Sequence, residues 1–144
     1  MTKDFLEALA TDVGEDPVLV AGAPKKEQIT EVEEYANFIL PEDYAHFLER
    51  FGAVIAGPYS IYGLGASEAM GSNERSVIEV TERFRRDKWP GVDNSLVISM
   101  DHAGNAITLN AQGEVHRFDH DAGETTMIAS AFGDFVKLCL IGSV

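Results

Sequence analysis

Histidines and carboxylates gather in the second half of the chain, where their types suit a metal site. The run His116-Arg-Phe-Asp119-His120-Asp121 holds four of them, and Asp101-His102 lies upstream. A metal ion needs its ligands to converge within about 2 Å. On a strand, however, His116 and His120 stand about 13 Å apart, and the aspartates face the opposite side. We therefore expect solvated strand and turn groups here. A small metal-dependent hydrolase built on His102, His116 and His120 stays an alternative.

Other residues that could do chemistry have simpler structural interpretations. Glu42-Asp43 resembles an acid–base pair, but it follows Leu40-Pro41, and carboxylates in the first turn of a helix favour its dipole. The single cysteine, Cys139, lies in an apolar run with nothing nearby to lower its pKa, so we expect a buried thiol rather than a nucleophile. The sequence contains neither a nucleophile elbow nor a phosphate-binding loop. We predict no enzyme activity, no catalytic residue, no metal and no cofactor.

Charge favours a protein as the partner. The chain has 24 acidic and 11 basic residues, a net charge of −13. Residues 1–50 carry a net −8 and residues 93–144 a net −5. Phosphate backbones and anionic membranes repel such a chain, whereas a basic protein would be steered towards it. On charge alone, an acidic surface that only keeps the protein soluble and monomeric is an equally good interpretation. We expect a basic protein partner, with no nucleic acid and no membrane.

The basic residues are concentrated in one segment. Residues 75–88 hold five of the eleven, namely Arg75, Arg83, Arg85, Arg86 and Lys88. Acidic residues are mixed with them, namely Glu74, Glu79, Glu82 and Asp87. Mixed signs along a helix indicate a solvated face rather than a nucleic-acid patch.

A partner-binding rim is predicted near the end of the last meander strand. Asp119, Asp121 and Glu124 cluster there in the sequence, and we expect an exposed Tyr59 or Tyr62 beside them. Tyrosine and complementary charge recur at protein interfaces. These five residues are the predicted binding site.

Length and local composition indicate one domain in the cytoplasm. A chain of 144 residues matches the commonest domain size. The N-terminus lacks a long apolar region, and no apolar run approaches a membrane span. A single cysteine fits a reducing compartment. We divide the expected domain, residues 1–144, into an N-terminal helix and irregular arm (1–24) and a core (25–141).

Periodicity predicts an α+β fold. Helices are expected at residues 2–10, at 25–39, from Pro41 to Gly52, at 76–88, and from Thr125 or Thr126 to Ile141. Ser76 and Glu79 have the spacing of a capping box. Short strands are expected at 53–56 and 59–62, and an antiparallel meander at 96–100, 106–110 and 114–120. N-terminal, middle and C-terminal helices would pack on this antiparallel sheet.

Several segments, in this order, resemble the SUKH superfamily. They are Leu40-Pro-Glu-Asp-Tyr44 with Phe47-Leu48 and Phe51-Gly52; Ile61-Tyr-Gly-Leu64; Leu96-Val-Ile-Ser99 with Asp101-His-Ala-Gly-Asn105; Val115-His-Arg-Phe-Asp-His120; and Ala129-Ser-Ala-Phe132 with Asp134-Phe135. The resemblance covers residues 25–141. It departs from the family at Gly52-Ala53, where a Gly-Gly pair is usual. The matching residues are core and turn positions, so no functional residue carries over.

The resemblance implies a cofactor-free domain that binds proteins. In bacteria the superfamily includes immunity proteins, which bind and neutralise toxins delivered between competing cells. It also includes cell-wall-assembly regulators. We therefore expect an immunity protein for a polymorphic bacterial toxin. A regulatory or scaffold module without a toxin is the alternative.

Overall fold

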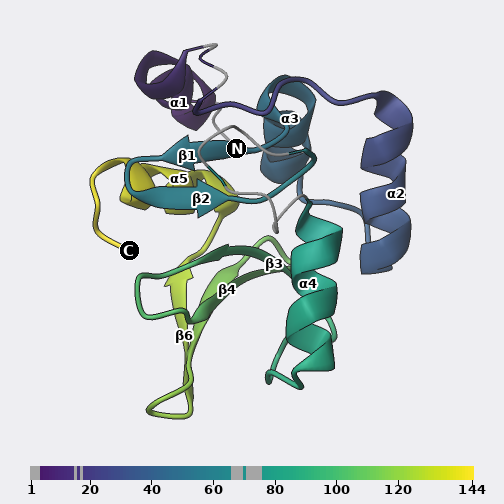
Figure 1. Cartoon of the computed structure of the whole chain (residues 1–144), viewed down its shortest axis with the longest axis vertical. Coiled ribbons are helices and arrows are strands. Elements are labelled where there is room, and N and C mark those ends of the chain that lie inside the picture. The colour runs from purple at the N-terminus through teal and green to yellow at the C-terminus, as the bar shows by residue number, and fades with distance from the viewer. Residues whose placement is uncertain (1–3, 15, 17, 66–69, 71–75) are drawn as a thin grey trace.

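The fold is α+β, as predicted. The computed structural model describes residues 4–14, 16, 18–65, 70 and 76–144. Its helices are α1 (Asp4–Val13), α2 (Lys26–Ala36), α3 (Glu42–Phe51), α4 (Val77–Arg86) and α5 (Phe132–Leu140). Its strands are β1 (Val54–Ala56), β2 (Tyr59–Ile61), β3 (Ser95–Met100), β4 (Ala106–Asn110), β5 (Val115–Asp119) and β6 (Glu124–Ala129). Figure 1 shows the helices packed around these strands.

The strands form two antiparallel sheets. β1 pairs with β2, and a meander runs in the order β3-β4-β5-β6. The backbones of the two sheets meet where the Tyr62 amide donates to the Ile98 carbonyl at 2.7 Å. The predicted irregular arm runs beside β1, where Val20 forms an antiparallel bridge with Val54. β1 and β2 thus join the arm to the meander.

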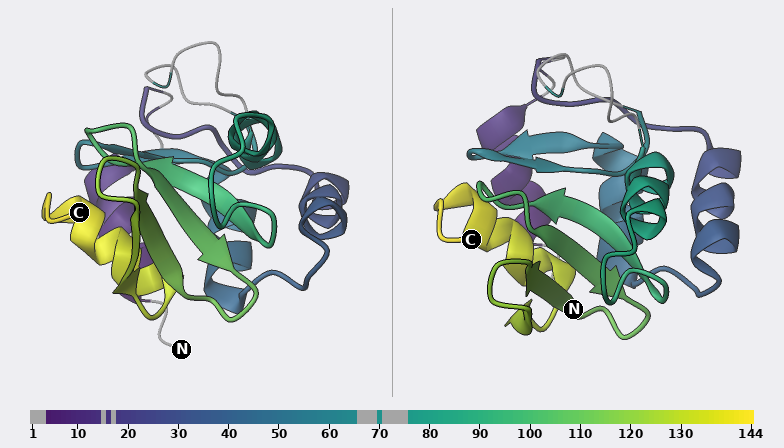
Figure 2. Two further views of the ribbon diagram at one scale, coloured as in Figure 1. Left: turned by 90° about the horizontal axis from the view of Figure 1, so that it is seen from below. Right: turned by 60° about the horizontal axis from the view of Figure 1, so that its bottom comes forward.

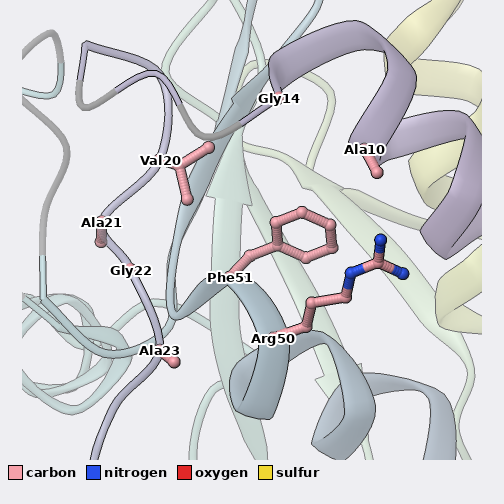
Figure 3. Close-up of a pocket in the computed structure, with 8 residues that line it drawn as sticks. All are labelled: Ala10, Gly14, Val20, Ala21, Gly22, Ala23, Arg50 and Phe51. Carbon is pink, nitrogen blue, oxygen red and sulfur yellow. The ribbon is translucent and has the colours of Figure 1, made fainter.

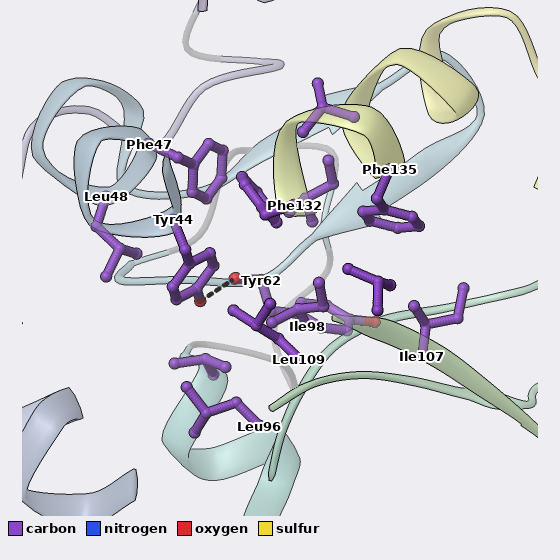
Figure 4. Close-up of a cluster of buried hydrophobic side chains, with 14 of the residues drawn as sticks. Tyr44, Phe47, Leu48, Tyr62, Leu96, Ile98, Ile107, Leu109, Phe132 and Phe135 are labelled. Atoms are coloured by element: carbon purple, nitrogen blue, oxygen red, sulfur yellow. Dashed lines mark hydrogen bonds between the residues drawn. The ribbon is translucent and has the colours of Figure 1, made fainter. Parts of the chain in front are cut away.

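The core lies between the meander and helices α1, α3 and α5. Aromatic rings of α3 and α5 interlock there, and Phe132 contacts Tyr44 and Phe47 at ring-centroid distances of 5.0 and 5.2 Å. Leu96, Ile98, Ile107 and Leu109 supply the sheet side of this cluster (Figure 4). The Tyr44 hydroxyl donates to the Tyr62 carbonyl at 2.8 Å. Burial raises the pKa of Tyr44 far above its ordinary value.

The predicted helix boundaries are mostly close to the observed ones. Gly52 ends α3 with φ of 73°, a conformation that glycine adopts without strain. The Ser76 hydroxyl accepts the Glu79 amide at the start of α4, as the capping-box spacing predicted. α4 ends at Arg86, shortly before the expected limit at Lys88.

The N-terminal helix belongs to the same core. α1 runs to Val13 instead of Ala10, and its predicted start at residues 2–3 lies outside the described residues. Phe5, Leu6 and Leu9 are buried, and Phe5 meets Phe132 edge-on at 5.8 Å. Both views of Figure 2 show α1 beside α5.

The expected long closing helix is wrong in its first half. Residues 124–129 form the strand β6, and α5 begins only at Phe132. Thr125 and Thr126 are β-branched and pair with Phe118 and Arg117 of β5. Cross-strand pairing therefore overrides the helical spacing of the apolar residues in this segment. Phe132, Phe135, Val136 and Cys139 form the buried face of the remaining helix.

Candidate protein-binding surface

Three predicted acidic residues meet at one end of the β5–β6 hairpin. Asp119 and Glu124 are cross-strand partners, and Asp121 lies in the turn between them. The Asp119 carboxylate accepts the backbone amides of Asp121 and Ala122 at 2.9 and 3.1 Å, so it also holds the turn. The Asp121 side chain is 85% exposed, and Glu124 is exposed as well. We call Asp119, Asp121 and Glu124 the acidic turn.

A polar network supports the acidic turn from the neighbouring β3–β4 loop. Asp101 accepts the Asn105 backbone amide at 2.9 Å and its side-chain amide at 3.0 Å. The Asn105 carbonyl oxygen in turn accepts the His120 backbone amide at 3.0 Å and contacts the His120 ring. Because Asn105 is buried, this chain fixes the end of β5 to the β3–β4 loop.

Asp101 is held as a carboxylate. Partial burial opposes its ionisation, but hydrogen bonds from the side chain and backbone of Asn105, the Ala103 amide and the charge of Arg117 outweigh that effect. The pKa of Asp101 is therefore lowered below its ordinary value.

One face of the meander opens into a groove that extends to Phe118 and Thr125, the cross-strand pair next to Asp119 and Glu124. Because neighbouring pairs alternate between the two faces, the side chains of Asp119 and Glu124 point to the other face. Strand pairing sets Thr108 opposite His116, and Phe118 opposite Thr125, on this face. The loop after α4 forms the other wall, and the cavity measures about 410 Å³. We call it the sheet groove; its lining includes Pro90, Asn94, Thr108, His116, Phe118 and Thr125.

Phe118, which lines the sheet groove, belongs to a small cluster of aromatic side chains. Trp89 packs edge-on against Phe118 at 5.8 Å and lies 5.4 Å from the His120 ring. Met127, the cross-strand partner of His116, is 51% exposed. Half-exposed aromatic rings and a flexible methionine beside carboxylates suit contact with another protein.

A second hollow, of about 550 Å³, lies between α1, the arm and the end of α3. Small residues line most of it, and the Arg50 side chain extends towards α1 (Figure 3). The Arg50 guanidinium already pairs with Glu7 at 2.9 Å and lies over the Phe51 ring. Arg50 therefore joins α3 to α1.

The expected exposure of Tyr59 and Tyr62 is wrong. Tyr59 is 4% and Tyr62 6% exposed. The Tyr59 ring stacks on His102 at 4.8 Å, and β2 lies well away from the β5–β6 turn in Figure 1. Both tyrosines are buried because β2 lies between the meander and the α1–α5 layer. The structure brings together only the three acidic members of the predicted rim.

The candidate metal-binding histidines have separate surroundings. His102 stacks on Tyr59, His116 lines the sheet groove, and His120 contacts Asn105 and Trp89. Among the described residues, no group of three or more His, Cys, Asp or Glu side chains is placed to hold a metal ion.

Asp43 and Cys139 have structural surroundings. Asp43 is 1% exposed, and its carboxylate accepts the amides of Tyr44 and Gly133, at 2.8 and 3.0 Å. It therefore joins the first turns of α3 and α5. Cys139 is buried, as predicted, and burial raises the pKa of its thiol to about 12.

Two arginines of the basic segment have structural partners. Arg85 donates to the carbonyls of Val92, Asp93 and Ser95 and lies over the Tyr35 ring. Arg83 lies over the Phe84 ring. Arg75 lies outside the described residues. The Arg85 contacts hold the end of α4 against the loop that follows it and against α2. The two arginines are not arranged as a phosphate-binding site.

Sequence reasoning missed the sheet groove. Residues 125–127 were assigned to a helix, so the strand that supplies Thr125 to the groove was not expected. The two consecutive threonines, Thr125 and Thr126, were the available signal, since β-branched residues favour strands. No local sequence pattern predicts the contact between Trp89 and Phe118, because the two residues lie far apart in the sequence.

The family of this chain is established by comparison. A family model described as SMI1-KNR4 cell-wall, SUKH_5, matches residues 2–141. The chain therefore belongs to the SUKH superfamily. The match includes the N-terminal segment, which agrees with the packing of α1 against α5. A search of curated proteins found no match.

Membership in this family indicates function through protein–protein interaction, in a class that is generally non-catalytic. Over the described residues, none of the helices has the length and apolar character needed to cross a membrane.

Proposed function

We propose that this protein is an immunity protein that binds a cognate bacterial toxin domain and blocks its active site or substrate channel. Family membership supports a protein-binding role. The observation that carries the proposal is the acidic turn at the end of the β5–β6 hairpin, whose other face lines the sheet groove, in a chain of net charge −13. A toxin domain that acts on nucleic acid has a basic surface, and such a surface complements this one.

The acidic turn suits electrostatic capture. Asp121 and Glu124 are exposed, and Asp119 is fixed by two amides of its own turn. Carboxylates held on a rigid hairpin lose little freedom on binding, which lowers the cost of association. Phe118 and Met127 add apolar contact area next to the charge.

Co-expression with the product of the neighbouring gene tests this function. If the upstream gene encodes a large secreted toxin, its C-terminal domain is expressed with and without this protein. We expect growth to stop with the toxin domain alone and to recover when both are made. The two proteins should also co-purify. A toxin that remains lethal and does not co-purify contradicts the proposal.

A regulatory or scaffold module is the second candidate, because the matching family model carries a cell-wall description. For that function we expect no toxin gene next to this one. Loss of the protein would then alter cell-wall composition.

A further inference from the structure

The open edge of the meander is the feature that extends the proposed function. β6 stands last in the order β3-β4-β5-β6. In the described part of the chain, β6 pairs with no strand except β5. A strand in this position has unpaired N–H and C=O groups along its outer side, which form a template for another strand.

The other sheet edges are covered. At β3, the Val97 amide donates to the Thr81 hydroxyl of α4 at 2.9 Å, and the Ile98 carbonyl accepts the Tyr62 amide. At β1, the Ala53 carbonyl accepts the Ala21 amide, and the Ile55 amide donates to Leu19, both at 2.9 Å. The arm and α4 therefore protect these edges, whereas β6 has no such cover among the described residues.

The sequence of β6 has little of the usual protection of an edge strand. Natural edges carry charged residues, especially lysine, or proline or a bulge, and Glu124 is the one charged residue of β6. Glu124, Thr125, Thr126 and Met127 include neither lysine nor proline, and all four are exposed. Their pairing with β5 is regular, because the register shift lies beyond Met127, towards Ala129. The N–H and C=O groups of this stretch that point away from β5 are thus ready to pair.

The negative charges around β6 favour a basic segment as its pairing partner. Glu124 begins the strand, and Asp119 and Asp121 lie beside it. Arg117 is the only basic residue of residues 115–129, and its Nε lies 3.8 Å from the Asp101 carboxylate. A second copy of this chain would bring the same carboxylates to the edge and be repelled, whereas lysine or arginine would be attracted.

From these observations we propose that residues 124–127 of β6 take up an extended basic segment of the toxin domain as an added strand. Main-chain hydrogen bonds to β6 would hold the segment, and alternate side chains would enter the sheet groove beside Phe118 and Met127. The acidic turn would contact its lysine or arginine side chains. This inference rests on the proposed function, since the toxin domain supplies the strand.

Amide hydrogen exchange of the free protein and of its complex tests the added strand. The probe is the C-terminal domain of the secreted protein encoded next to this gene. We expect the outward-facing amides of residues 124–128 to exchange at least about tenfold more slowly in the complex, because each gains a hydrogen bond. The amides of the covered strand β3 should be nearly unchanged.

Two proline variants provide an independent measurement. N–H groups along a strand point alternately to either side, so one of Thr125→Pro and Thr126→Pro removes only an outward N–H. That variant should keep the thermal stability of the protein, yet its affinity for the toxin domain should fall by at least about tenfold. Thr30→Val, on exposed α2, is the matched control and should keep wild-type affinity.

The possible outcomes separate this inference from the proposed function. If the β6 amides exchange equally fast in the complex and in the free protein, and the stable proline variant keeps wild-type affinity, the added strand is contradicted. The immunity function is not affected by that result. Protection of β6 in the free protein that rises with its concentration identifies a second copy as the occupant, and overturns the inference. Absence of any complex contradicts both.

Discussion

Asp43 shows how a carboxylate in a suggestive sequence can have a structural role. Its two oxygens accept amides from the first turns of α3 and α5, although Gly133 lies far along the chain. The sequence predicted a helix-start role for Glu42-Asp43. It could not reveal the bond to α5, because nothing in the local pattern indicates which distant amide a buried oxygen will meet.

Replacement of Asp43 should destabilise the fold. Asp43→Ala leaves the buried Gly133 amide without its acceptor, and an unsatisfied buried donor costs about 1–3 kcal/mol. Urea denaturation measures the loss. The control is Glu42→Gln in the same turn, where the exposed side chain should change the unfolding free energy by less than about 1 kcal/mol. Equal effects of both variants would contradict the role of Asp43.

Asp101 should make the stability depend on pH in the acid range. Its pKa is lowered in the folded protein, so its contribution is present above the unfolded value of about 3.9 and is lost as the pH falls through the folded pKa. Asp101→Asn should therefore destabilise the protein at neutral pH, by an amount that shrinks below about pH 4.

Urea denaturation of wild type and Asp101→Asn from about pH 7 to pH 2 checks this dependence. Glu49→Gln is the control, since its side chain is exposed on α3, an element that does not contribute to the Asp101 network. A difference between wild type and Asp101→Asn that stays constant across the range would show that ionisation of Asp101 does not stabilise the fold.

At the scale of elements, the amphipathic segments were predicted well from local pattern. The apolar stripe of α3, the capping of α4 and the first three meander strands all follow local rules. β6 was missed because its residues also fit helical spacing, and only pairing with β5 decides between the two. Burial of Tyr59 and Tyr62 likewise depends on the layers above and below β2.

The contact between α1 and α5 depends on one glycine. A Cβ on Gly133 would lie 2.8 Å from the Phe5 ring, closer than carbon atoms pack. Gly133→Ala should therefore separate α1 from α5 and cost about 1–3 kcal/mol. Lys137→Ala, on the exposed side of the same helix, should change stability by less than about 0.5 kcal/mol.

A double-mutant cycle of Gly133→Ala with Phe5→Leu tests whether the new methyl group clashes with the Phe5 ring. Because the smaller side chain gives space to the new methyl group, the two changes should cost less together than the sum of their separate effects. Additive effects would show that Phe5 is not the residue that Gly133 accommodates.

At the scale of the whole molecule, the charge distribution should govern how fast a basic partner binds. Exposed charges are screened within about 10 Å at 0.1 M salt and about 3 Å at 1 M. The association rate constant should therefore fall as salt rises, while the dissociation rate constant changes less. Surface plasmon resonance with a toxin domain identified by the co-expression test measures both rate constants.

Matched charge variants show whether the acidic turn is responsible. Asp121→Asn with Glu124→Gln should slow association by up to about tenfold. Glu31→Gln with Glu34→Gln removes the same charge from exposed positions on α2, far from the hairpin in Figure 1, and should have a smaller effect. Equal slowing by both pairs would mean that net charge alone matters.

The central claim is that this SUKH domain binds a toxin stoichiometrically. Isothermal titration calorimetry of the purified protein with a toxin domain identified by the co-expression test measures the stoichiometry and the affinity. We expect one toxin domain bound per chain, with a dissociation constant in the nanomolar range or below, as for other tight protein–inhibitor pairs. Absence of binding at concentrations of about 10 μM, far above that range, would contradict it.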